Sequence, residues 1–383
     1  MPFSVPSVLL TQRALMISVV DLLCPLNACS FLWMETLVMT DEPQHRRRIR
    51  YKGTHPRHFQ EKYKELDPEA DGQELAKVRE RGHTPAGTHR PICVDEILEI
   101  LKPQPGEVGL DATLGYGGHA QELLARLQPG GRLFGLDVDP LELPRTEARL
   151  RGLGFGPETL VVKRMNFAGL PGLLPETEGG FDFVLADLGV SSMQIDNPTR
   201  GFTFKADGPL DLRLNPQRGQ PASALLQRLS EQELAELLVA NSDEPYAESI
   251  ARALQGQSIT TTRQLAHGVR QALAGFFPEE TREVDTRKCL QRTFQALRIA
   301  VNDEFGVLDQ FLAHLPRCLK SGGRVAILTF HSGEDRRVKK AFQSGFREGI
   351  YARIAEEPIR PSGEERRANP RSASAKLRWT IKG

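Results

Sequence analysis

Apolar residues recur at helical spacing soon after residue 90. Residues 94–101 place apolar side chains three and four positions apart, which predicts a helix. The next segment, residues 102–106, contains two prolines and a glycine. Because proline cannot continue a helix, we expect this helix to end there.

A strand, a glycine loop and a second helix follow this turn. Residues 108–113 form an apolar run typical of a strand, residues 115–118 are rich in glycine, and residues 119–127 have helical spacing. A second apolar strand over 132–136 leads to Asp137. This order of elements predicts a βαβ unit.

An all-helical block interrupts the later strands. Strands are predicted at 159–163, 181–186 and 324–330, the last one introduced by a glycine turn over 321–323. Between residues 222 and 285 the pattern predicts helices alone. Helix starts are marked by Ser230 with Glu233, a capping box, and by the threonines at 260–262 before a helix over 264–273.

The alternation of strands and helices predicts an α/β fold with a parallel sheet, into which a helical domain is inserted. Residues 45–52 are strongly basic, and the chain up to about residue 81 lacks aliphatic periodicity. We interpret this segment as an arm, either a solvated linker or a contact to RNA. The expected segments are an N-terminal extension over 1–80, the α/β domain over 81–198, a loop and helical insertion over 199–290, and the rest of the α/β domain with a basic tail over 291–383.

Charge is distributed unevenly along the 383 residues. The total of +1 excludes a uniformly basic nucleic-acid binder. From Arg336 to the end, however, 13 Lys and Arg stand against 5 Asp and Glu, which leaves −7 for the rest of the chain. The tail therefore either contacts a polyanion or packs against the acidic remainder.

Cysteine usage and the N-terminal segment favour a reduced, cytoplasmic protein. The five cysteines form no Cys-x-x-Cys pair, and no histidine pair stands near them at zinc spacing, so no metal site is predicted. Residues 1–39 are apolar, but charges and a proline interrupt them, so neither a membrane span nor a signal peptide is expected. Their irregularity also fits a start codon placed too far upstream.

The glycine loop marks a nucleotide-like cofactor site. Glycines let the backbone approach a ligand, and the helix N-terminus behind them offers free N–H groups. Gly115 and Gly117, with Asp137 twenty residues after Gly117, also satisfy a dinucleotide fingerprint in which the acid binds ribose hydroxyls. Asp111 favours S-adenosylmethionine over NAD, because a carboxylate there binds an ammonium and repels a pyrophosphate. Asp137 as a mere turn residue is the alternative.

A second polar loop follows the strand over 181–186. Asp187 ends this strand, and small polar residues up to Gln194 come next. Ligands of open α/β sheets bind at the carboxyl ends of strands. We therefore expect Asp187 at the ligand site, although an acid at a strand end is also a common helix cap.

Several separate segments, in order, resemble one enzyme family, the 16S rRNA (cytosine-N4)-methyltransferases. These are class I S-adenosylmethionine enzymes that methylate a cytidine in the decoding region of the small ribosomal subunit. The matching segments lie at 89–96, 111–119, 187–196, 200–204, 207–213, 293–298, 330–336 and 369–371. The resemblance implies a class I methyltransferase sheet, with 16S rRNA as substrate and partner.

The resemblance also implies the residues that hold the cofactor. Gly117, Gly118 and His119 belong to the glycine loop, and Asp137 is expected on the ribose. Phe167 is expected beside the adenine. Asp187 and Gln194 are expected near the reacting end.

The target amine needs help to react. The lone pair of the cytosine exocyclic nitrogen is delocalised into the ring, so an acceptor must bind an amine hydrogen and favour the attacking geometry. The Asp/Asn-Pro-Pro-Tyr motif of many amino-methyltransferases is absent after this strand. We expect Asp187, Ser191 and Ser192 to take its place.

Substrate contacts are expected from basic side chains. Arg200, Arg213 and Arg218 lie in a glycine- and proline-rich loop, and arginine binds phosphates in a forked geometry. Arg298, on a helix whose apolar face is core, and His331 complete the expected set. The segment Ser332-x-x-Asp335 after the strand is alternatively a capped helix start.

Two other functions stay open on the sequence. A nicotinamide-dependent dehydrogenase would use the same fingerprint, but no separate His/Lys constellation for it is found. A non-catalytic RNA-binding or assembly protein could retain the cofactor for stability. The sequence also leaves a homodimer open.

Overall fold

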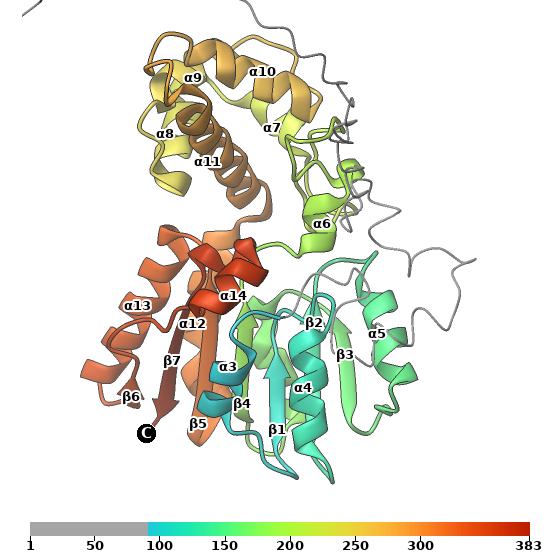
Figure 1. Ribbon diagram of the computed structural model, residues 1–383. Coiled ribbons are helices and arrows are strands. Elements are labelled where there is room, and N and C mark those ends of the chain that lie inside the picture. The colour runs from blue at the N-terminus through green and yellow to red at the C-terminus, as the bar shows by residue number, and fades with distance from the viewer. Residues whose placement is uncertain (1–90) are drawn as a thin grey trace, which may run out of the picture. The chain divides into compact units, whose positions relative to one another are not determined.

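The computed structural model describes residues 91–383, which form part of one compact unit (Figure 1). The predicted arm, its basic run at 45–52, and Cys24 and Cys29 lie outside the described residues. So does the whole of the expected N-terminal extension over 1–80, together with its boundary.

A single seven-stranded sheet forms the centre of this unit. The strands are β1 (Val108–Asp111), β2 (Arg132–Asp137), β3 (Leu160–Arg164), β4 (Phe181–Asp187), β5 (Leu319–Thr329), β6 (Tyr351–Ile354) and β7 (Lys376–Lys382). Their order is β3-β2-β1-β4-β5-β7-β6. The first five strands are parallel, whereas β7 is antiparallel to both β5 and β6. The α/β class predicted from the sequence is confirmed.

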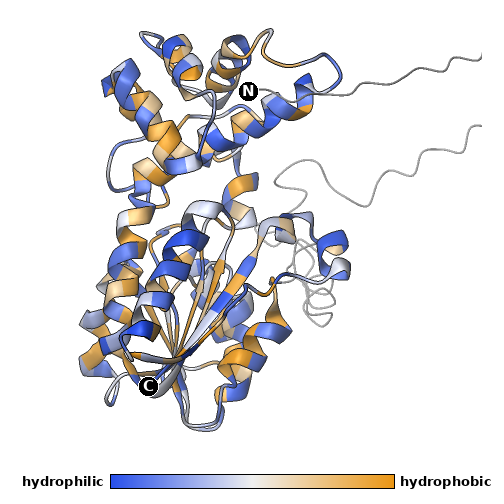
Figure 2. Cartoon of the chain, turned by 90° about the vertical axis from the view of Figure 1, so that its left-hand side faces the viewer, coloured by the Kyte–Doolittle hydropathy of each residue, from blue (hydrophilic) through white to orange (hydrophobic). Residues whose placement is uncertain are grey.

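The central strands are apolar because both faces of the sheet are covered. On one face Phe134, Phe181 and Val184 pack with Phe311 and Val338. Alternate residues of the same strands face a second apolar cluster on the other side. Figure 2 shows hydrophobic residues along the strands and on one side of many helices.

Helices from three parts of the chain cover these faces (Figure 1). The helices of the α/β part are α3 (Val94–Leu101), α4 (Gly118–Leu127), α5 (Leu143–Gly152), α6 (Ser192–Asp196), α12 (Glu304–Cys318), α13 (Ser332–Arg347) and α14 (Gly363–Ala368), with short 3-10 helices at η2 (Phe167–Glu176), η3 (Pro198–Arg200) and η4 (Pro370–Ser374). Residues of α3, α4 and α5 pack on one face. Residues of α12, α13 and η2 pack on the other.

The predicted helical insertion is present and has its own apolar cluster. Its helices are α7 (Ala222–Arg228), α8 (Glu231–Ser242), α9 (Ala247–Leu254), α10 (Thr262–Ala272) and α11 (Arg282–Asn302). Capping boxes at Ser230 and Thr261 start α8 and α10, as the sequence predicts. The expected boundary at residue 290 falls inside α11, which runs unbroken to Asn302. We propose that the insertion ends where α11 gives way to α12, at Asp303.

Two features of the C-terminal third differ from the prediction. β5 begins at Leu319, so the expected turn over 321–323 lies within the strand, beside an irregularity in its pairing with β4. β6 and β7 were not predicted, because their residues were assigned to a basic tail.

Among the described residues, the structure has no helix long and apolar enough to cross a membrane.

Candidate active site

The carboxyl ends of the parallel strands border a cavity of about 480 Å³. Thirteen of the sixteen residues expected at the site line it. They are Asp111, Gly115, Gly117, Gly118, His119, Asp137, Phe167, Asp187, Ser191, Ser192, Gln194, Arg298 and His331. The three remaining residues, Arg200, Arg213 and Arg218, lie elsewhere.

The glycine loop has a conformation that other residues would not adopt easily. Gly117, the residue before α4, has φ +79°, in the left-handed region that favours glycine. A Cβ on Gly118 would lie 2.4 Å from Cγ of Pro91. The loop is fixed from outside by Thr146, whose Oγ1 donates to the carbonyl of Gly115 at 2.6 Å. Close packing against Pro91 and Thr146 therefore fixes this loop, whose glycines line the cavity.

Asp137 anchors this loop as well as facing the cavity. One carboxylate oxygen accepts the N–H of Gly115 and the other accepts the N–H of Asp139, both at 2.9 Å. Burial raises the pKa of Asp137, and these N–H groups oppose the shift. Each oxygen keeps a further lone pair, so a ribose hydroxyl can still bind.

Asp111 is a buried acid at the end of β1, with 2% of its surface exposed. Burial raises its pKa to about 7, although His119 and the N–H of Thr113 favour the charged form. A carboxyl group in such a position gains from a cationic partner that enters the cavity. The amino group of a methionine moiety is a cation of this kind.

The side chains of His119 and Asp187 lie close to each other in the wall of the cavity. Nε2 of His119 lies 3.6 Å from Oδ2 of Asp187, and neither this nitrogen nor Oδ1 of Asp187 has a hydrogen-bond partner among the described residues. The N–H of Asp187 donates to Oγ1 of Thr113 at 2.6 Å, which fixes the end of β4 against β1. Asp187 therefore presents a free acceptor at the strand end.

Ser191 and Gln194 form a capping box at the start of α6. The Ser191 hydroxyl accepts the N–H of Gln194, and the Gln194 amide oxygen accepts the N–H of Ser191. The Gln194 amide nitrogen donates to Oδ2 of Asp139 at 2.8 Å. These bonds hold the polar loop closed against the end of β2, so both side chains position the loop.

Two of the expected RNA-binding arginines have partners inside the protein. Arg200 is 5% exposed, and its Nη1 lies 2.7 Å from Oδ2 of the fully buried Asp139. Its Nη2 donates to the carbonyl of Leu214 at 2.8 Å. Arg213 binds Asp211 through Nε and Nη2. The expectation of phosphate contacts is therefore wrong for Arg200 and does not fit Arg213, whereas Arg218 is exposed.

Phe167 starts η2 and contacts Phe311 edge to face, with ring centroids 5.0 Å apart. This contact fixes one side of its ring against the core while the residue lines the cavity. The placement fits the expected apolar contact to an adenine.

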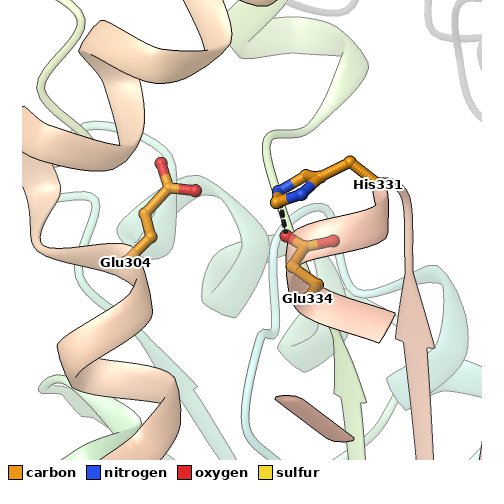
Figure 3. Close-up of side chains that lie close together, drawn as sticks. All are labelled: Glu304, His331 and Glu334. Atoms are coloured by element: carbon orange, nitrogen blue, oxygen red, sulfur yellow. Dashed lines mark ion pairs between the residues drawn. The ribbon is translucent and has the colours of Figure 1, made fainter. Parts of the chain in front are cut away.

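The structure adds polar residues that the sequence reasoning missed. The carboxylate of Glu304, at the start of α12, accepts hydrogen bonds from Nε and Nη2 of Arg298 at 2.8 and 2.9 Å. Glu334, on the first turn of α13, lies 3.2 Å from Nε2 of His331 (Figure 3). Glu334 lies inside a segment that resembled the family, whereas no spacing pattern marks Glu304 or Asp139.

The alternative interpretation, in which Ser332 caps the helix that follows, is wrong. His331 precedes α13, and no side chain caps its first N–H groups. The Ser332 hydroxyl instead donates to Asp243 of the insertion at 3.2 Å. Glu334 closes the turn, because its Oε2 accepts the N–H of Phe330 at 2.7 Å.

Several cations of the basic tail pair with acids of the body. Arg378, 4% exposed in β7, and Lys376 both bind Asp335, at 2.6 and 2.7 Å. Arg371 binds Asp196 at 2.7 Å. This part of the tail therefore packs against acidic residues of the protein, which is the second of the two interpretations of its charge.

Comparison with known proteins identifies relatives along most of the chain. Residues 86–382 match the model of the MraW methylase family. The "Ribosomal RNA small subunit methyltransferase H 2" of Alkaliphilus metalliredigens is 57% identical over 346 residues, 89% of this chain and 99% of the relative. The "Ribosomal RNA small subunit methyltransferase H 1" of Lachnoclostridium phytofermentans is 55% identical over 346 residues, 89% of this chain and 94% of the relative.

A solved structure of a putative rRNA-methylase from Clostridium thermocellum is also similar, at 13% identity and a TM-score of 0.35, covering 76% of this chain and 95% of that one. The alignments with these two relatives cover 89% of the chain, which is more than residues 91–383 make up. The sequence similarity therefore extends into the segment before α3. The resemblance inferred from the motifs is confirmed: the chain belongs to the MraW methylase family.

Proposed function

We propose that this chain transfers a methyl group from S-adenosylmethionine to N4 of a cytidine in the decoding region of 16S rRNA. The observation that carries the proposal is one cavity that joins the glycine loop, the buried acid Asp111 and the free acceptor of Asp187. The family and the names of its ribosomal RNA relatives support the substrate class. A ribosomal substrate supports a cytoplasmic location for the reaction.

The residues present fit S-adenosylmethionine. Gly115, Gly117 and Gly118 line the cavity, and the helix α4 that follows Gly117 presents the N–H groups of its first turn there. Asp111 would hold the ammonium, Asp137 the ribose and Phe167 the adenine. When bound, the cofactor supplies an activated methyl group.

Asp187 is the chain's own best acceptor for an amine hydrogen. Its Oδ1 is buried without a hydrogen-bond partner among the described residues, which is costly unless a ligand group binds there. Ser191 is occupied in the capping box, so Asp187, with Ser192 beside the loop, is favoured for contact with the amine. Orienting the nitrogen against the methyl group contributes several kcal/mol of the rate acceleration.

Methyl transfer to small ribosomal subunits that lack the modification tests this proposal. We expect the purified chain to transfer label from S-adenosylmethionine to the RNA, which neither a dehydrogenase nor an assembly protein would do. Asp187→Asn keeps the size and loses the charge, so single-turnover transfer should fall well over tenfold. Asp309→Asn, on the exposed side of α12, is the matched control. Transfer by Asp187→Asn at the parent rate would remove Asp187 from the reaction.

A further inference from the structure

Four polar side chains meet at one end of the cavity, between α11, α12 and the start of α13. Glu304 approaches from α12, and His331 and Glu334 approach from the opposite side (Figure 3). One ligating atom from each of these three residues lies within 4.8 Å of the others. Arg298 completes the group, which we call the acid–histidine cluster. All four members line the cavity that Asp187 also lines.

The cluster contains hydrogen-bonding capacity that the protein itself does not use. Nε2 of His331 lies 3.2 Å from Oε1 of Glu334, whereas Nδ1 has no hydrogen-bond partner among the described residues, and the side chain is only 11% exposed. Glu304, 14% exposed, accepts two hydrogens from Arg298 and keeps two lone-pair sites. Buried polar groups of this kind are normally satisfied, so a ligand with matching groups is indicated.

A divalent cation is a poor match for this cluster. Arg298 binds both oxygens of Glu304, so a metal would have to sit beside a buried guanidinium. Burial alone would raise the pKa of Glu334, but His331, the N–H of Phe330 and Arg298 outweigh it and hold the pKa below its usual range. The carboxylates already have cationic or N–H partners, which favours a neutral ligand carrying both donors and acceptors.

The spacing fits a planar amine. Two hydrogen bonds of about 2.9 Å, donated by one NH₂ group with its hydrogens about 120° apart, place their acceptors about 5 Å apart. The cluster atoms lie within 4.8 Å of one another. The cluster therefore has room for an exocyclic amine that donates one hydrogen to Glu304, and the second hydrogen is left for Asp187.

We propose that the acid–histidine cluster binds the Watson–Crick edge of the target base and selects cytosine. Glu304 accepts a hydrogen from N4, and His331 and Arg298 face N3 and O2 as donors. Carboxylates are a common partner of the cytosine amine. Uracil presents the acceptor O4 in place of the N4 amine and the donor N3–H in place of N3. Its O4 would face the acceptor Glu304, and its N3–H would face a donor of the cluster. This inference rests on the proposed function and names the side chains that recognise its substrate.

Neighbouring residues hold the cluster in place. Asn302 uses its amide fully, accepting the N–H of Leu214 and donating to the carbonyls of Leu212 and Arg298. Phe305 contacts the His331 ring, with centroids 5.8 Å apart. A Cβ on Gly333 would lie 2.5 Å from Cζ of Phe305. The glycine therefore makes room for the ring that supports His331.

Discrimination between cytidine and uridine separates recognition from a structural role. Small subunits are reconstituted with cytidine or uridine at the position that the parent chain methylates, and their affinities are compared by competition. For the parent we expect cytidine subunits to bind more tightly. Glu304→Gln should reduce this preference about fivefold or more, since an amide can donate to O4 of uracil. Binding of S-adenosylmethionine should change by less than about twofold.

Two further variants keep the test decisive. Glu283→Gln, exposed on the first turn of α11, should leave the preference intact. If Glu304→Gln fails to fold, His331→Gln, which does not break the Arg298 pair, should show the same loss of preference. An unchanged preference in both folded cluster variants would overturn the inference. A metal site would also overturn it. That outcome would be binding of Mn²⁺ alone to the parent chain, loss of this binding in Glu304→Gln, and loss of methyl transfer when a chelator is added.

The result for the parent chain distinguishes the two proposals. A parent chain that makes no N4-methylcytidine contradicts the proposed function itself. A parent chain that makes it, while the cluster variants keep the full preference for cytidine, contradicts only the assignment of the cluster.

Discussion

Arg200 and Asp139 form a buried ion pair, with Nη1 of Arg200 2.7 Å from Oδ2 of Asp139 and side chains that are 5% and 0% exposed. The same Asp139 oxygen accepts the amide of Gln194. The pair therefore ties the loop after α6 to the end of β2, next to the cavity. An arginine that sequence reasoning assigned to RNA is part of the frame that shapes the site.

Removing Arg200 should cost stability rather than RNA affinity. Arg200→Ala leaves the Asp139 carboxylate buried without its cation, so the free energy of unfolding should fall by about 3 to 5 kcal/mol in denaturant titration. The salt dependence of RNA binding should keep its slope. A folded variant of unchanged stability whose slope is about one unit smaller would return Arg200 to the RNA surface.

The tail offers a matched pair of arginines. Arg378 is buried against Asp335, whereas Arg366 is exposed on α14. Arg378→Ala should lower the melting temperature and leave the RNA salt slope unchanged. Arg366→Ala should keep the melting temperature and, where Arg366 contacts a phosphate, reduce the slope by about one unit. Equal melting temperatures for the two variants would contradict the buried role of Arg378.

Asp137 should affect both cofactor and loop. Asp137→Ala removes the acceptor of two backbone N–H groups and the expected ribose contact, each worth about 1.5 to 3 kcal/mol when charge-assisted. Binding of S-adenosylmethionine should weaken at least tenfold in calorimetry, and thermal stability should also fall. Asp137→Asn, which keeps an acceptor, should lose less of both. Parent affinity in a folded Asp137→Ala variant would remove the assignment.

Cofactor binding should depend on pH through Asp111. Burial raises the pKa of this carboxyl to about 7, so binding a cationic amino group favours loss of its proton. Affinity should therefore rise with pH up to about 7, by at most about tenfold per pH unit, and should fall again above about pH 8, where the amino group of the cofactor loses its proton.

The sign for stability is opposite. Because the folded pKa of Asp111 is raised, its contribution to the stability of the cofactor-free chain is fully present at acidic pH and is lost as pH rises through 7. Asp111→Asn should bind the cofactor more weakly and flatten this part of the pH profile. The parent pH profile in Asp111→Asn would show that another group, such as Asp137, is responsible.

The sheet and the cofactor half of the site could be predicted because their signals are local. The glycine loop, Asp111 and Asp137 stand within one βαβ unit, and the capping boxes of α8 and α10 lie within four residues each. Elements of this kind carry their own start and stop signals. The strand ends then bring Asp187 to the same edge.

The remaining errors come from partners that are distant in sequence. Arg200 is buried because Asp139 lies 61 residues away in the chain but adjacent in space. β7 was overlooked because its Lys376 and Arg378 were counted as free charge, whereas Asp335 of α13 neutralises both. The pairing of Arg298 with Glu304 has a different cause, because these residues are only six positions apart. It depends on the change of direction between α11 and α12 at Asp303, whose φ of +50° no sequence pattern marked.

Mapping the methylated nucleoside tests the central claim most directly. Small subunits that lack the modification are incubated with the purified chain and labelled S-adenosylmethionine, and the RNA is digested and analysed by mass spectrometry. The account predicts one N4-methylcytidine, located in the decoding region of 16S rRNA. Label on another atom of the nucleoside, on another RNA, or on no RNA at all would contradict it.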